Sequence, residues 1–113
     1  MRTATYERLR AKQPIERTLD VALDDTEAVT VRFRSIGHRA YDALVVAHQE
    51  GKDDGAPFNP ETFGPALVAA SAVEPALSAE QVAVLWDEWN AGDLLALFAA
   101  ALEANTASNV RGG

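Results

Sequence analysis

Side chains that could carry out acid–base or metal chemistry are few and far apart in this chain of 113 residues. The two histidines, His38 and His48, are ten residues apart, which on one helix turns their side chains about 80° out of register. They therefore do not form a joint metal site; we expect His48 to be half-buried and structural, and His38 to face solvent. The chain has no cysteine, which excludes disulfides, thiolate zinc sites and cysteine nucleophiles.

The acidic side chains offer no better catalytic centre. Asp53-Asp54 could bind a divalent cation, but the spacing of an EF-hand does not follow, so solvated loop charge is the expected role. Asp87 and Glu88 are adjacent on a predicted helix, where their side chains point about 100° apart and do not converge. Glycine-rich phosphate loops, nucleophile elbows and His-Glu-x-x-His sequences are absent. We expect no enzymatic activity, no cofactor and no metal.

Trp86 and Trp89 are the strongest individual residues. Each indole can bury on the order of 200 Å², and such rings are typical both of hydrophobic cores and of protein interfaces. Both roles stay open, with the core the commoner one and an interface anchor the alternative in so small a chain.

Charge and hydropathy limit the possible partners. The net charge is −7, divided into +1 over residues 1–35 and −8 over residues 36–113. So acidic a chain is not expected to bind nucleic acid. The longest apolar run, residues 94–102, is about half of the ~20 residues that cross a membrane, and the N-terminus lacks the apolar stretch of a secretory signal. We therefore predict a cytoplasmic protein with no membrane partner.

Residues 18–34 alternate between apolar and polar side chains and predict a β-hairpin with one apolar and one wet face. Arg32 and Arg34 fall on the wet face, where we expect them to blunt a sheet edge. Because two strands alone are not stable in water, helices or another chain must cover the apolar face. Six residues form that face: Leu19, Val21, Leu23, Val29, Val31 and Phe33.

Four helices are predicted after the hairpin, with a mobile loop at residues 50–58 and a break at residues 73–77. Gly64-Pro65 should kink or restart the second helix, and Ser78 with Gln81 forms a capping box for the third. The predicted helices cover residues 36–49, 59–72, 78–89 and 94–105.

The expected fold is α+β and mostly α: a two-stranded antiparallel hairpin followed by a bundle of about four short helices. The chain should be organised as a basic flexible arm at residues 1–17, one globular domain at residues 18–105 and a disordered tail at residues 106–113.

The order of these features resembles the small tail assembly chaperones of long-tailed, siphovirus-type bacteriophages and prophages, particularly the actinobacterial ones. The resemblance covers residues 18–105. It rests on the hairpin and on four segments: Ile36-Gly37-His38-Arg39-Ala40-Tyr41-Asp42-Ala43-Leu44, Phe58-Asn59-Pro60-Glu61-Thr62-Phe63, Leu77-Ser78-Ala79-Glu80-Gln81-Val82 and Trp86-Asp87-Glu88-Trp89-Asn90.

The resemblance implies a non-catalytic protein of the bacterial host cytoplasm that acts in virion morphogenesis. Such a chaperone binds the hydrophobic tape-measure protein, keeps it soluble, recruits tail-tube subunits and is absent from the finished particle. Members often occur also in a longer, frameshifted form, and the end at residues 106–113 would suit that junction. Self-association is a further possible property.

A binder of tape-measure helices should expose an apolar groove. The surplus of apolar side chains on the last two helices predicts that Trp86, Trp89, Leu94, Phe98 and Leu102 supply it. Two other hypotheses stay open. One is a structural tail or connector subunit in which the hairpin edge pairs with neighbours in a ring. The other, held well below it, is a small-molecule-binding or enzymatic domain with His48 and Asp53-Asp54 at its site.

Overall fold

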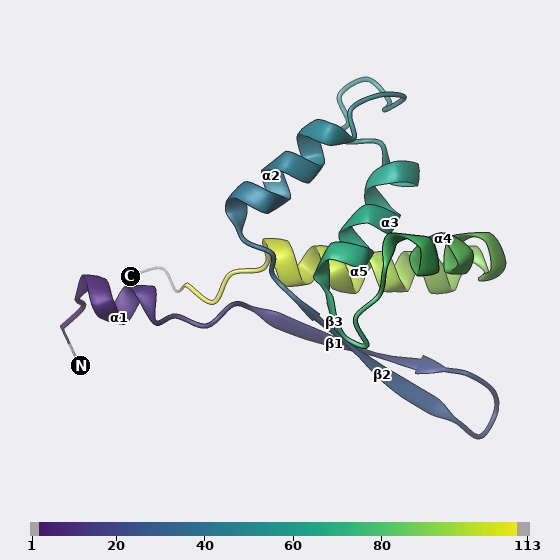
Figure 1. Cartoon of the computed structure of the whole chain (residues 1–113), viewed down its shortest axis with the longest axis horizontal. Coiled ribbons are helices and arrows are strands. Elements are labelled where there is room, and N and C mark those ends of the chain that lie inside the picture. The colour runs from purple at the N-terminus through teal and green to yellow at the C-terminus, as the bar shows by residue number, and fades with distance from the viewer. Residues whose placement is uncertain (1–2, 111–113) are drawn as a thin grey trace.

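A computed structural model describes residues 3–110 as an α+β fold in which a three-stranded antiparallel sheet packs against helices (Figure 1). The expected α+β class is confirmed. The expected sheet of two strands was wrong, because a third strand joins the hairpin. None of the described helices is long and apolar enough to span a membrane. The elements are α1 Tyr6–Arg10, β1 Glu16–Ala22, β2 Ala28–Arg34, α2 His38–Ala47, α3 Pro60–Ser71, β3 Ala72–Glu74, α4 Ala79–Glu88 and α5 Ala91–Thr106.

The predicted hairpin is formed by β1 and β2, which pair with Leu19 opposite Val31 and Val21 opposite Val29. Asp24 closes the turn because one of its carboxylate oxygens accepts hydrogen bonds from the backbone N–H groups of Thr26 and Glu27, both at 2.8 Å. These bonds, chiefly the one from the Thr26 backbone, lower the pKa of Asp24 below its ordinary value.

The third strand, β3, lies where the sequence predicted only a break. Two of its three residues pair antiparallel with β2, Ala72 opposite Phe33 and Glu74 opposite Arg32, and the register shifts between these two pairs. Three residues are too few to show an alternating pattern, so pairing with β2 decides this strand.

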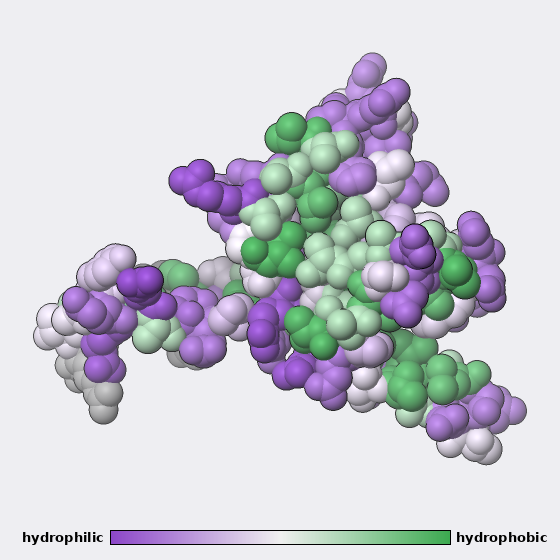
Figure 2. All heavy atoms as spheres, viewed as in Figure 1, coloured by the Kyte–Doolittle hydropathy of each residue, from purple (hydrophilic) through white to green (hydrophobic). Residues whose placement is uncertain are grey.

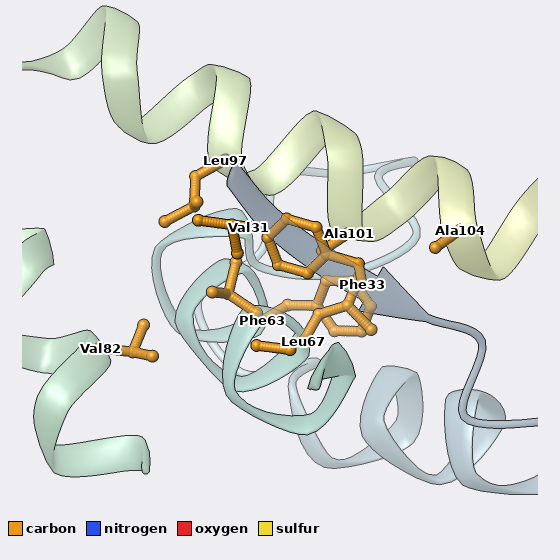
Figure 3. Packing of buried hydrophobic residues seen from close by; sticks show 10 residues of the cluster. Val31, Phe33, Phe63, Leu67, Val82, Leu97, Ala101 and Ala104 are labelled. Carbon is orange, nitrogen blue, oxygen red and sulfur yellow. The ribbon is translucent and has the colours of Figure 1, made fainter. Parts of the chain in front are cut away.

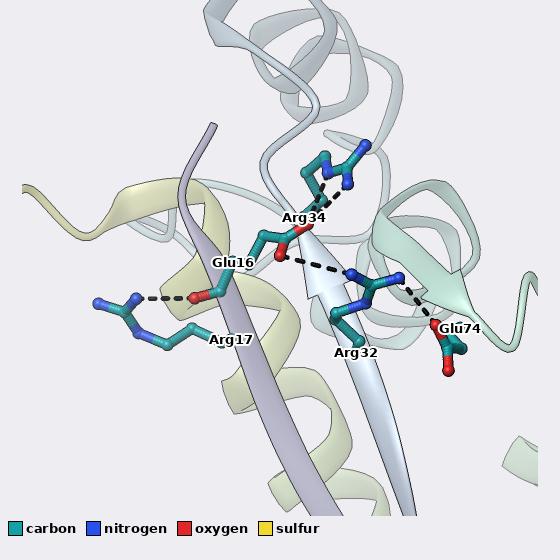
Figure 4. A network of polar contacts seen from close by, with 5 residues as sticks. All are labelled: Glu16, Arg17, Arg32, Arg34 and Glu74. Carbon is teal, nitrogen blue, oxygen red and sulfur yellow. Dashed lines mark hydrogen bonds and ion pairs between the residues drawn. The ribbon is translucent and has the colours of Figure 1, made fainter. Parts of the chain in front are cut away.

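Arg32 and Arg34 were expected to protect an exposed sheet edge. Both lie instead on the central strand, β2. Arg34 forms an ion pair with Glu16 of β1 at 2.7 Å, and Arg32 pairs with Glu74 of β3 at 2.8 Å and with Glu16 at 3.7 Å (Figure 4). The wet face of the sheet is thus crossed by paired charges that join its three strands.

The four predicted helices are present as α2 to α5, and a short fifth helix, α1, lies within the arm. The predicted restart at Gly64-Pro65 was wrong, since α3 is one continuous helix. Proline at position 65 removes only the hydrogen bond to the Glu61 carbonyl, near the start of the helix. The predicted capping box is confirmed: Ser78 and Gln81 each bond the other's backbone N–H.

The core lies between the sheet, α3 and α5, with α4 at its side (Figure 3). Phe63 of α3 is fully buried at its centre. The aromatic rings of Tyr41, His48, Phe58 and Phe98 surround it at centroid distances of 4.0 to 6.1 Å. The buried apolar residues are Val31, Phe33, Phe63, Leu67, Val68, Ala72, Val82, Leu97, Ala101 and Ala104.

Asn105 joins three parts of the fold through one side chain. Its amide nitrogen donates to the hydroxyl of fully buried Ser71 at 2.8 Å and to the Ala101 carbonyl at 2.8 Å. Its amide oxygen accepts a hydrogen bond from the Ile36 N–H at 2.8 Å. The end of α5 is thereby fixed to the end of α3 and to the link between β2 and α2.

The molecule is more extended than a compact monomer of its size. Its radius of gyration is 16.1 Å, whereas a compact chain of this length has about 13 Å. Its accessible surface is 8146 Å², whereas about 6,000 Å² is usual for its mass. Two features project from the body, the arm with α1 and the far end of the hairpin (Figure 1).

The ends of the globular domain differ by one or two residues from the predicted boundaries. The sheet begins at Glu16, inside the predicted 1–17 arm, and α5 includes Thr106, the first residue of the predicted tail. Residues 107–110 have no regular secondary structure. The parts of the predicted arm and tail at residues 1–2 and 111–113 lie outside the described residues.

Substituting Asn105→Ala should destabilise the fold by about 1–3 kcal/mol, because the Ser71 hydroxyl and the Ile36 N–H lose their hydrogen-bond partner. Urea unfolding followed by circular dichroism would measure the change. Asn109→Ala is the matched control, since Asn109 is exposed in the segment after α5, and its effect should stay within about 0.5 kcal/mol. Equal stability of the two variants would contradict this role of Asn105.

Candidate partner-binding groove

An open groove of about 390 Å³ lies where the end of α4, the start of α5 and the start of α3 meet. Its lining is mostly apolar and aromatic, with one carboxylate, that of Glu61, at its edge. The lining residues are Pro60, Glu61, Trp86, Trp89, Ala91, Leu94, Leu95 and Phe98.

The short connection between α4 and α5 positions the two tryptophans. The Trp89 N–H still bonds the Leu85 carbonyl at 2.9 Å, and the next residue, Asn90, already caps α5 by accepting from the Asp93 N–H at 3.0 Å. The chain therefore turns within two residues. This tight turn sets Trp86 and Trp89 beside the first turns of α5.

The α3 wall of the groove depends on the absence of a side chain at Gly64. A β-carbon there would lie 3.0 Å from Cζ2 of Trp86 and 3.6 Å from Cδ1 of Phe98. Glycine thus lets the indole of Trp86 rest directly on the helix. Asn59 caps the same helix by accepting from the Glu61 N–H at 3.1 Å, which fixes Pro60 and Glu61 at the mouth of the groove.

Four of the five residues predicted to form a groove are brought together in it, namely Trp86, Trp89, Leu94 and Phe98. The fifth, Leu102, does not line it and instead packs, half-buried, against the core. Sequence reasoning did not place Pro60, Glu61 or Leu95 there. The sequence could have indicated Leu95, because it follows Leu94 on the most apolar helix. Adjacent helical side chains point in different directions, so the two leucines do not both face the same part of the core.

The tryptophans combine the two roles that the sequence left open. Both are half-buried and pack against core residues, and both also present surface to the groove. Leu95 is different, since its side chain is 68% exposed while lining the same groove. Substitutions at Leu95 can therefore test binding with little effect on the core.

The other candidate residues do not converge on a site. His48 lies edge-on to Phe63 as part of the core aromatic cluster, and His38 is exposed with its Nε2 3.4 Å from an Asp42 oxygen. Asp53 and Asp54 are exposed in the loop between α2 and α3. Within residues 3–110 there is no group of three or more His, Asp or Glu side chains that could hold a metal ion.

No protein-family model, curated protein or solved structure matches the chain. Its function therefore has to be inferred from the surfaces of the molecule itself.

Replacing each of two helical glycines with alanine should change stability in opposite directions. Gly64→Ala should lower it by about 1–3 kcal/mol, since the new methyl group displaces the Trp86 ring. Gly92→Ala should raise it by about 0.4–1 kcal/mol, because a β-carbon there meets no atom within 4 Å and alanine favours the helix. Urea unfolding monitored by tryptophan fluorescence would test both; stabilisation by Gly64→Ala would show that Trp86 does not rest on α3.

Proposed function

We propose that this protein is a phage tail assembly chaperone, which binds and solubilises the tape-measure protein and recruits tail-tube subunits during tail assembly. The groove at the α3, α4 and α5 junction is the proposed binding surface for the tape-measure protein. The action is by contact alone, without catalysis or a cofactor.

The observation that carries this proposal is that two segments of the resemblance meet in the groove. The segment at residues 58–63 supplies Pro60 and Glu61, and the segment at residues 86–90 supplies Trp86 and Trp89. More than twenty residues of chain separate these segments, and each alone is an ordinary capping or packing pattern. Their meeting at one open apolar surface supports a shared role in binding.

The chemistry of the groove favours an amphipathic helix as its ligand. Aromatic and leucine side chains form the floor, which suits apolar residues spaced i, i+3 or i+4, and i+7 on a partner helix. Glu61 lies at one edge, and Asp87, Glu88 and Asp93 are exposed on the helices that form the groove. A helix with basic residues beside its apolar stripe would be the best match.

A structural tail or connector subunit is the second candidate, and it is favoured by a different observation. The far end of the hairpin exposes apolar side chains, and β1 is an edge strand of the described sheet. Such a subunit would form rings and stay in purified particles. A chaperone would be missing from mature tails, so the protein content of purified virions separates the two.

The groove can be tested by co-expression with the tape-measure protein encoded in the same genomic neighbourhood. The wild-type chain should keep the tape-measure protein soluble and co-purify with it. Leu95→Asp should abolish this recovery, because it places a charge in the apolar floor that the partner must cover.

Val46→Asp is the matched control, since Val46 is an equally exposed apolar residue at 73% on α2, far from the groove residues in the chain. It should leave the recovery unchanged, and both variants should keep the wild-type circular dichroism spectrum. Equal recovery with Leu95→Asp and wild type would contradict the groove. Failure of the wild-type chain to solubilise the tape-measure protein would contradict the chaperone function itself.

A further inference from the structure

The far end of the hairpin carries an apolar surface that the body of the molecule does not cover. Leu23 is 54% exposed and Val29 is 41% exposed, although both belong to the inward face of the sheet. Between them and the body lies a depression of about 350 Å³, and Figure 2 shows the apolar side chains gathered over the hairpin. We call this surface the hairpin patch, formed by Val21, Leu23, Val29, Pro75, Leu77, Leu85 and Trp89.

A second uncovered apolar feature lies on the arm. Tyr6 and Leu9 of α1 are 69% and 67% exposed, and their spacing of three residues places them on one face of the helix. All residues from 3 to 14 are exposed, and within the described chain the hydrogen bonds of residues 5–13 stay inside that segment. A helix of five residues is not stable by itself in water, so α1 needs a surface to pack on.

We propose that the arm of one copy of this chain docks on the hairpin patch of a second copy, with Tyr6 and Leu9 inserted in the apolar depression. The occupant is thus the same protein, and the contact lies beside the groove proposed for the tape-measure protein, with Trp89 shared between the two surfaces.

The charges around the two features are opposite in sign. Arg8, Arg10 and Lys12 accompany the apolar pair on the arm, with Glu7 the one acidic residue between Thr5 and Pro14. The turn at residues 24–27, next to Leu23, contains three acidic residues and no basic one. Docking the arm on the patch brings these groups together, which favours this pairing over contact between two arms or two patches.

The arm does not lie on the hairpin patch of its own chain. The two features lie at opposite ends of the longest axis of the molecule, which measures 50 Å (Figure 1). The patch is therefore open to the arm of another copy.

The surface available is large enough for a stable contact between copies. The accessible area exceeds that of a compact monomer by about 2,000 Å², and a standard protein interface buries about 1,200–2,000 Å². Because the arm and the patch are different surfaces, two copies can exchange arms in a closed dimer, or successive copies can be linked into a larger ring or an open chain.

Mixing two complementary variants tests this arrangement on the full-length protein. Wild type should self-associate as its concentration rises, measured by sedimentation velocity. Tyr6→Ser/Leu9→Ser and Leu23→Ser/Val29→Ser should each weaken association by at least about tenfold. An equimolar mixture of the two variants should form a 1:1 dimer that grows no further, because only one arm and one patch remain intact. Val46→Ser, which alters an exposed valine on α2, should associate like wild type.

Charge reversal gives a second test that leaves the apolar residues in place. Arg8→Glu/Arg10→Glu and Asp25→Lys/Glu27→Lys should each weaken association, and a chain that carries all four substitutions should associate again through the reversed pairs. Asp24 is left unchanged because its carboxylate holds the turn. Association of wild type should also weaken at about 1 M salt, where the Debye length is about 3 Å.

Three results would overturn the proposal: a wild-type chain that stays monomeric at its highest soluble concentration, self-association that survives the arm variant, or two variants that fail to combine. Binding of the tape-measure protein or of a small apolar probe to the patch without self-association would assign it another occupant. Because these measurements use the purified chain alone, their outcome does not depend on whether the proposed chaperone function is correct.

Discussion

The apolar face of the hairpin is longer than the helical layer that covers it, and this mismatch shapes the rest of the molecule. Seven residues per strand extend about 23 Å. Phe33 and Val31 are buried beneath α3 and α5, but Val29, two residues further along the same face, is not. No described helix covers the far end of this face, where Leu23 and Val29 stay exposed. The buried core is consequently small and centred on Phe63.

A small core makes the few interactions around it more important. Asn105 holds the α5 end against α3 through hydrogen bonds in a place where apolar packing is thin, and the aromatic rings around Phe63 fix α2 and the following loop. At the other end of α5, the absence of a side chain at Gly64 lets Trp86 close the gap between α3 and α4. What remains open beside that ring is the groove. The incomplete cover of apolar surface by the helices thus leaves both the groove and the hairpin patch open.

Local patterns made much of this fold predictable from the sequence. The alternation at residues 18–34 and the Ser78–Gln81 capping box are strong signals because each is satisfied within a few residues of chain. The third strand could not be read, since three residues carry no period and only pairing with β2 defines them. The helical restart predicted at Pro65 was wrong because the proline lies near the start of α3 and removes only one of its hydrogen bonds. Leu102 was wrongly predicted to line the groove, and Leu95 was not predicted to line it. Both errors have one cause, since periodicity identifies the apolar side of α5 but not which neighbouring element covers each part of that side.

The two open surfaces are not independent, because Trp89 lines both of them. Its indole lies between the groove and the hairpin patch, so a ligand on either side restricts the ring. Ordering a side chain on binding costs free energy, and a ring already held by one ligand does not incur that cost again for the second. Occupation of the patch by a neighbour's arm should therefore favour occupation of the groove, and the reverse holds by linkage. A single tryptophan at the junction of α4 and α5 would in this way couple assembly of the protein to capture of its partner.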